Sequence, residues 1–170
     1  SLDGSSSSRY DQYKTGSYVN TAMYMGTNST SYYFSVANGN ISRFFDEMYL
    51  NTPWDYHYSS LDGRTILDRL ASVKYFAVKR NGYGYIPYGY DEEAASTKKY
   101  RIYEDEDSLP LGYTYDSWIS REKYEKLSVT EKQQALLQGA VVEKSSLPET
   151  QLSFDDKKAD FTLEAGKGCK

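Results

Sequence analysis

The sequence contains little cysteine, histidine or proline, and each shortage excludes a kind of chemistry or structure. Its 170 residues include one Cys (Cys169), one His (His57) and four Pro. A single Cys cannot close an internal disulfide, so the fold must hold without one. With one His and one Cys next to the C-terminus, we expect no metal site. We also expect no cofactor, because the chain lacks a glycine-rich phosphate-binding loop.

Long hydrophobic runs and basic clusters are also missing. No apolar segment approaches the ~20 residues of a membrane-spanning helix, so we expect the chain as given to be soluble. There is no signal-peptide pattern. The net charge is −4, and the densest basic cluster is Lys98-Lys99-Tyr100-Arg101. Nucleic acid is therefore not expected as a partner, because phosphate binding requires a cationic surface.

Tyrosine, in contrast, is abundant, with 19 Tyr against 6 Phe and 2 Trp. Two loop clusters of aromatic and polar residues stand out as candidate ligand-binding residues. They are Trp54, Asp55, His57 and Tyr58, and Tyr83, Tyr85, Tyr88 and Tyr90. Rings beside carboxylates and amides suit contact with sugars. The same rings suit the headgroup layer of a bilayer or simple packing between loops, and the sequence leaves these three interpretations open.

Reactive groups are few, and we assign no catalytic residue. Asp55 and His57 would point the same way on an extended segment and could form an orienting pair. A free-standing hydrolase would also need a nucleophile, and no recognisable one is present. The acidic run Glu104-Asp-Glu-Asp107 lacks the spacing of a calcium loop, so we expect a solvated acidic turn.

Hydrophobic periodicity predicts a mixture of short strands and helices. Ile41, Phe44, Phe45, Met48 and Tyr49 form the clearest amphipathic stripe. Asp62 is a plausible N-cap for a helix over 62–72, and Ser128 with Glu131 matches a capping box whose helix Gly139 would close in a left-handed conformation. Strands are expected at 9–13, 31–36, 73–78, 100–103, 111–115, 140–142, 151–154 and 160–163.

These elements do not alternate strictly, which favours the α+β class. We expect one domain with a mixed or antiparallel sheet and three or four helices packed on it. The expected boundaries are a flexible lead over 1–8, an α+β domain over 9–165 and a flexible tail over 166–170.

The order of these motifs resembles the soluble extracytoplasmic region of the bacterial YfhO-family membrane proteins. The resemblance runs from about Arg9 to Glu143. Its strongest parts are Leu61-Asp-Gly-Arg64, Val73-Lys-Tyr75, Leu109-Pro-Leu-Gly112 and Glu131-Lys-Gln-Gln-Ala-Leu-Leu137. The chain departs from the family pattern at Ser72, where Gly is common, and at Asp105, where Asn is common.

The resemblance implies a function that the residues alone do not. Such proteins are polytopic membrane proteins thought to be lipid-phosphate-sugar-dependent glycosyltransferases that decorate cell-envelope polymers such as teichoic acids. By this resemblance the chain is a membrane-proximal domain on the extracytoplasmic face of the cell membrane, itself non-catalytic, that recognises or orients the polymer acceptor. The alternative is an interaction module that docks on its own transmembrane portion or on a partner protein.

Overall fold

The computed structural model describes residues 8–12, 19–36, 38–51, 56–81 and 84–155, so most of the expected lead and tail lies outside the described residues. The helices are α1 (Thr21–Met25), α2 (Gly39–Glu47), α3 (Thr65–Leu70), α4 (Arg121–Glu125) and α5 (Val129–Ala135). The strands are β1 (Arg9–Gln12), β2 (Ser31–Tyr33), β3 (His57–Ser59), β4 (Val73–Lys79), β5 (Glu92–Ser96), β6 (Tyr100–Glu104), β7 (Trp118–Ser120) and β8 (Ala140–Val142).

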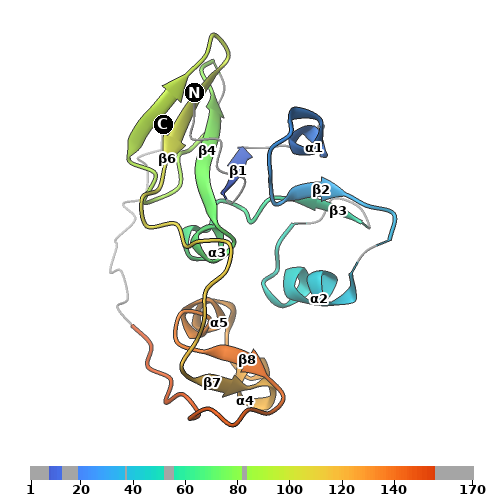
Figure 1. Cartoon of the computed structure of the whole chain (residues 1–170), viewed down its shortest axis with the longest axis vertical. Coiled ribbons are helices and arrows are strands. Elements are labelled where there is room, and N and C mark those ends of the chain that lie inside the picture. The colour runs from blue at the N-terminus through green and yellow to red at the C-terminus, as the bar shows by residue number, and fades with distance from the viewer. Residues whose placement is uncertain (1–7, 13–18, 37, 52–55, 82–83, 156–170) are drawn as a thin grey trace, which may run out of the picture.

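The main sheet has four strands in the order β1-β4-β6-β5. β1 runs parallel to β4, whereas β6 is antiparallel to both β4 and β5. The sheet is therefore mixed, and the α+β class is confirmed. β4 is central and is buried on both faces, which explains its nearly continuous apolar sequence from Val73 to Val78. Figure 1 shows this sheet at one end of the molecule.

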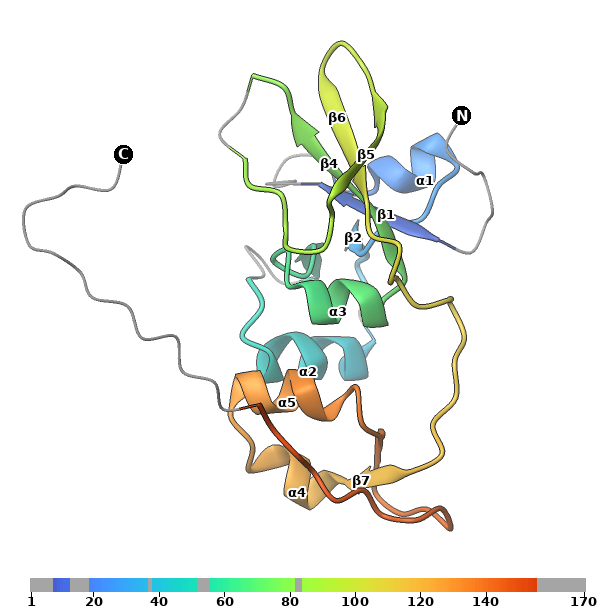
Figure 2. The ribbon, with the colours of Figure 1, turned by 90° about the vertical axis from the view of Figure 1, so that its left-hand side faces the viewer.

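Helices α2, α3, α4 and α5 lie below the sheet in Figures 1 and 2, whereas α1 lies beside the strands. Figure 2 shows α3 directly beneath the strands, followed by α2 and α5, with α4 and β7 farthest away. Two small pairings complete the fold, antiparallel β2–β3 and parallel β7–β8. The larger core lies among the helices and joins residues from every part of the chain, namely Phe45, Met48, Leu50, Tyr58, Leu61, Leu67, Ile119, Tyr124 and Ala135.

Side-chain caps start three of the helices. Asn38 caps α2 by accepting from the Asn40 amide, and Ser120 caps α4. The predicted capping box of Ser128 and Glu131 is confirmed at α5. Asp62, however, is not an N-cap. It has a φ of 57°, the left-handed turn it forms with Gly63 delays α3 to Thr65, and its carboxylate accepts from the Asn51 amide instead.

Two side chains of the predicted apolar stripe, Ile41 and Tyr49, are exposed. Tyr49 follows the end of α2 in a left-handed conformation, which turns its ring into solvent. Leu137 is likewise exposed after α5. The backbone of Gly139 is not left-handed. Glycine is needed there because the chain near Thr150 packs closely against it: a Cβ at position 139 would lie 2.5 Å from the Thr150 hydroxyl.

The strand predicted at 111–115 is wrong. The strand that pairs with β6 is instead β5, which lies in the polar segment before β6. The connection from β5 to β6 is shorter than the one from β6 to residues 111–115. The 111–115 segment is irregular, and its tyrosines bond backbone carbonyls instead: Tyr113 donates to Leu70 and Tyr115 to Leu136. Residues 151–154 also form no strand, and 160–163 lie outside the described residues.

Ser72, where the resemblance implies glycine, has a left-handed backbone conformation. It is a buried residue at the junction of α3 and β4, with a φ of 60°. A residue with a Cβ costs about 1–2 kcal/mol in this left-handed conformation, whereas glycine adopts it freely.

We expect Ser72→Gly to raise the free energy of unfolding by about 0.5–1 kcal/mol, because relief of this strain exceeds the extra entropy of glycine in the unfolded chain. Urea denaturation measures the change. Ser72→Ala, which keeps the Cβ, should stay near the unaltered protein. A glycine variant less stable than the alanine variant would contradict the explanation.

Candidate functional site

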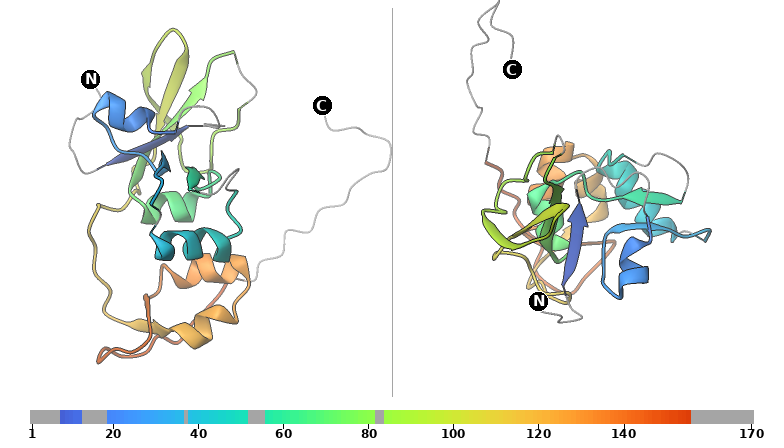
Figure 3. Two further views of the ribbon diagram at one scale, coloured as in Figure 1. Left: turned by 90° about the vertical axis from the view of Figure 1, so that its right-hand side faces the viewer. Right: turned by 90° about the horizontal axis from the view of Figure 1, so that it is seen from above.

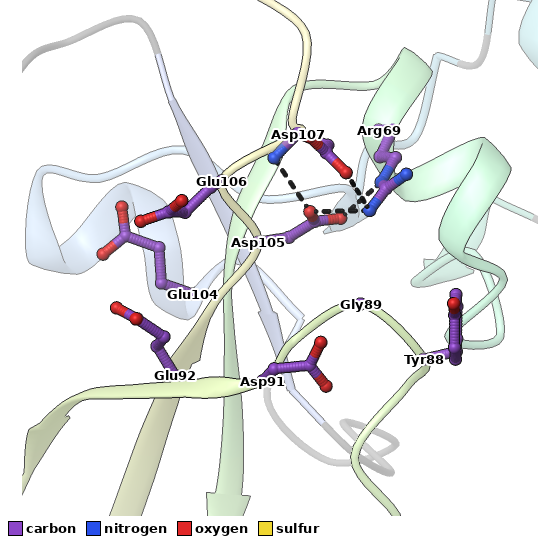
Figure 4. A pocket seen from close by; sticks show the side chains of 9 residues that line it. All are labelled: Arg69, Tyr88, Gly89, Asp91, Glu92, Glu104, Asp105, Glu106 and Asp107. Carbon is purple, nitrogen blue, oxygen red and sulfur yellow. Dashed lines mark hydrogen bonds and ion pairs between the residues drawn. The ribbon is translucent and has the colours of Figure 1, made fainter.

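A cavity of about 380 Å³ opens between α3, the loop before β5 and the end of β6. Figure 4 shows carboxylates around most of its wall and one arginine on α3. The lining residues are Arg69, Tyr88, Gly89, Asp91, Glu92, Glu104, Asp105, Glu106 and Asp107. We call this cavity the acidic pocket.

Arg69 joins α3 to the turn after β6. Its Nε lies 2.7 Å from Asp105 Oδ2 and its Nη2 lies 3.0 Å from Asp105 Oδ1, so the ion pair is bidentate. Nη2 also lies 2.8 Å from Asp107 Oδ2. Asp105 is only 1% exposed, so the prediction of a solvated acidic turn is wrong for this residue. The hydrogen bond to Asp105 raises the pKa of Arg69, which keeps the guanidinium charged.

Gly89 allows the loop before β5 to pass close to this ion pair. Its φ is +91°, and a Cβ there would lie 2.9 Å from Arg69 Nη2. The Thr65 hydroxyl, at the start of α3, donates to the Tyr88 carbonyl at 2.6 Å and fixes the loop. The Tyr88 side chain is 86% exposed. The result is a fixed backbone that presents a free aromatic ring beside the pocket (Figure 4).

The charge of the acidic pocket determines what it can bind. Lys74 pairs with Glu104 at 2.8 Å and Arg69 pairs with Asp105 and Asp107, but six carboxylates face these two cations. The wall therefore keeps a negative field that repels phosphate and attracts cations. Its carboxylates are hydrogen-bond acceptors, so hydroxyl and ammonium groups are the donors that match them.

Two buried carboxyl groups, Asp68 and Asp11, have raised pKa values, and Asp68 lies within electrostatic range of Asp105 in the pocket wall. Asp68, on α3, is fully buried, and neither of its carboxyl oxygens has a hydrogen-bond partner among the described residues. Burial, with the nearby charges of Asp11 and Asp105, raises the pKa of Asp68 to about 8. Burial also raises the pKa of Asp11 to about 6, although Thr30 and Ser29 donate hydrogen bonds to it.

The residues predicted to bind ligand fall into three groups. Trp54, Asp55 and Tyr83 lie outside the described residues. Tyr58 and Tyr90 are buried and belong to the packing: Tyr58 shares a hydrogen bond with Ser42, and the Tyr90 hydroxyl donates to the Val73 carbonyl at 2.8 Å. These two rings offer no exposed face.

The third group comprises His57, Tyr85 and Tyr88. The His57 ring packs on Tyr33, with centroids 4.4 Å apart, in the β2–β3 pair. Tyr85 is half exposed, and its hydroxyl donates to the Asp62 carbonyl, which fixes the turn at Gly63. Of the five predicted residues that the structure describes, only Tyr88 lines the acidic pocket. Sequence reasoning missed Arg69, because its partner is 36 residues away and no local pattern marks it.

The described residues lack two kinds of feature. No group of three or more His, Cys, Asp or Glu side chains there has an arrangement that could hold a metal ion. Within the same residues, no helix has both the length and the hydrophobicity needed to cross a bilayer.

Comparison with known proteins gives the family. The profile of the family described as "Bacterial membrane protein YfhO" matches residues 5–166. The uncharacterized protein YfhO of Bacillus subtilis (strain 168) is 28% identical over 130 residues, which cover 75% of this chain and 15% of that protein. The chain thus spans less than a fifth of the length of that relative. No solved structure matches the chain. The match over most of the sequence means that this chain belongs to the YfhO family of bacterial membrane proteins.

Proposed function

We propose that this chain is an outward-facing domain of a polytopic membrane glycosyltransferase and that it holds the polymer acceptor at the acidic pocket. Membership of a membrane-protein family supports the first part. The observation that carries the second part is the position of Tyr88, an exposed ring on a fixed loop beside a wall of hydrogen-bond acceptors. In a typical carbohydrate subsite, an aromatic ring packs on the C–H face of a sugar and carboxylates accept hydrogen bonds from its hydroxyls.

The charge of the pocket restricts how a teichoic-acid type polymer would bind. Phosphate groups would be kept away from the carboxylates, so hydroxyl groups between the phosphates would make the contacts. The domain would then present acceptor hydroxyls while the phosphates stay in solvent. The chemical step itself is assigned to the remainder of the parent protein, because no Ser, Thr, Cys, His or Lys side chain lines the pocket in the described residues.

NMR titration of the isotope-labelled chain tests this proposal. We expect a teichoic-acid fragment and an uncharged oligosaccharide to shift the amide signals of residues 88–92 and 104–107. Affinity for the anionic fragment should rise between low salt and about 0.3 M salt, because salt screens its repulsion from the wall. Affinity for the uncharged sugar should stay constant.

Tyr88→Ala should weaken binding of either ligand about fivefold to tenfold, the loss expected for one stacking contact. Tyr49→Ala is the matched control, because Tyr49 is also exposed but lies outside the pocket. If neither ligand shifts the pocket signals, acceptor recognition is excluded. The alternative, a non-catalytic module that docks on its membrane portion, would then be preferred.

A further inference from the structure

The chain has a second unusual surface, which is apolar and has no part in the acidic pocket. Six large apolar side chains are exposed on α1 and on β2 with the residues that follow it. They are Met23, Tyr24, Met25, Tyr33, Phe34 and Val36. Tyr24 is 96% exposed, an extreme value for an aromatic ring. We call these six residues the α1–β2 surface.

Hydrogen bonds hold the two parts of this surface together. The Asn20 side chain, just before α1, accepts from the Tyr33 amide at 2.9 Å and donates to the Tyr33 carbonyl at 3.0 Å. The residues therefore form one site on a folded framework. Figures 1 and 3 show α1 and β2 side by side on the flank of the molecule, apart from the α4–β8 end.

Charge is absent from the whole segment that carries this surface. Residues 15–42 contain no Asp, Glu, Lys, Arg or His, although 26% of the chain is charged. The polar residues of this segment are Asn, Ser, Thr and Tyr, and all of them are neutral. A surface that met only water would have no reason to exclude charges, whereas one that enters the headgroup–acyl boundary would, because charged side chains are costly there.

We propose that the α1–β2 surface lies against the lipid bilayer, with its Tyr, Met and Phe side chains at the headgroup–acyl boundary. Tyrosine is enriched at this depth because its ring is apolar while its hydroxyl stays wet. The family is one of membrane proteins, and most of the length of the relative lies outside this chain, so a bilayer is within reach. A bilayer also accepts projecting side chains such as Tyr24 without a matching pocket, which a protein partner would have to supply.

Depth-dependent fluorescence quenching tests this proposal on the 170-residue chain. In a Cys169→Ser background, the single variants Tyr24→Cys, Phe34→Cys and Leu137→Cys each carry an environment-sensitive fluorophore on the new thiol. Leu137 is the matched control, since it is exposed to a similar extent as Phe34 but follows α5. The chain is tethered through a C-terminal histidine tag to phosphatidylcholine vesicles that contain a trace of chelating lipid and brominated acyl chains.

We expect bromine to quench the probes at positions 24 and 34 at least about threefold more than the probe at 137. Tyr24→Glu with Phe34→Glu, read from a third probe at position 23, should remove this quenching, because two carboxylates would enter the boundary. Circular dichroism confirms that these exposed substitutions leave the fold intact. Equal quenching at all positions, or none at 24 and 34, overturns the proposal. The latter result would assign the surface to contact with protein, such as the parent's own membrane portion.

Discussion

Asp68→Asn should make the protein several kcal/mol more stable at pH 8 while changing little at pH 4. The Asp68 carboxyl is fully buried without a hydrogen-bond partner in the described residues, and its pKa is raised to about 8. The folded state therefore keeps a proton that the unfolded chain loses near pH 4. Stability must then fall as pH rises from about 4 to 8 and level off above, by about 5 kcal/mol for this group.

Asparagine has the same shape and cannot ionise, so the variant should lose most of this slope. Asp11, whose pKa is raised to about 6, acts in the same direction and leaves a smaller slope below pH 6. Glu122 and Glu131 have lowered pKa values, so their titration changes the free energy of unfolding only at more acidic pH. Urea denaturation at pH steps from 4 to 9 measures the effect. The control is Asp46→Asn on the exposed face of α2, and an unchanged slope in Asp68→Asn would refute the explanation.

Arg69→Ala should reduce the free energy of unfolding by about 3–5 kcal/mol, because it leaves Asp105 buried without its cation. The loss should also disorder the wall of the acidic pocket, which Arg69 ties to α3. Guanidinium or urea denaturation gives the magnitude. Arg43→Ala, an exposed position on α2, should change stability by less than about 0.5 kcal/mol.

A double variant separates the buried charge from the lost packing. Asp105→Asn in the Arg69→Ala background removes the unpaired charge and should recover most of the loss, whereas Asp105→Asn alone should be destabilising. If Arg69→Ala costs less than about 1 kcal/mol, the pair is not the connection that holds the pocket.

Local patterns in the sequence predicted the elements whose cause is local. The capping box of Ser128 and Glu131 and the strand at 73–78 were predicted from residues close together in the sequence, and both are confirmed. Strand pairing depends on distant partners. β5 is polar and has no alternation, yet it forms because β6 offers it hydrogen bonds.

The candidate site was harder to predict, because side chains of one type can serve two purposes. Tyr90 looks like its neighbour Tyr88 in the sequence, but its hydroxyl finds the Val73 carbonyl and allows the ring to be buried. Tyr88 finds no such partner inside and stays exposed. Similarly, Asp105 is buried and Asp107 is exposed in the same acidic run. Only Asp105 lies where the Arg69 guanidinium can bind both carboxylate oxygens.

The parallel pairing of β1 with β4 has a practical consequence for shortened forms of this protein. β1 occupies residues 9–12 and covers one side of β4 along most of its length. A chain that starts after residue 12 would uncover an apolar strand edge with unused backbone donors and acceptors. Such edges recruit other strands, so this truncation should promote self-association.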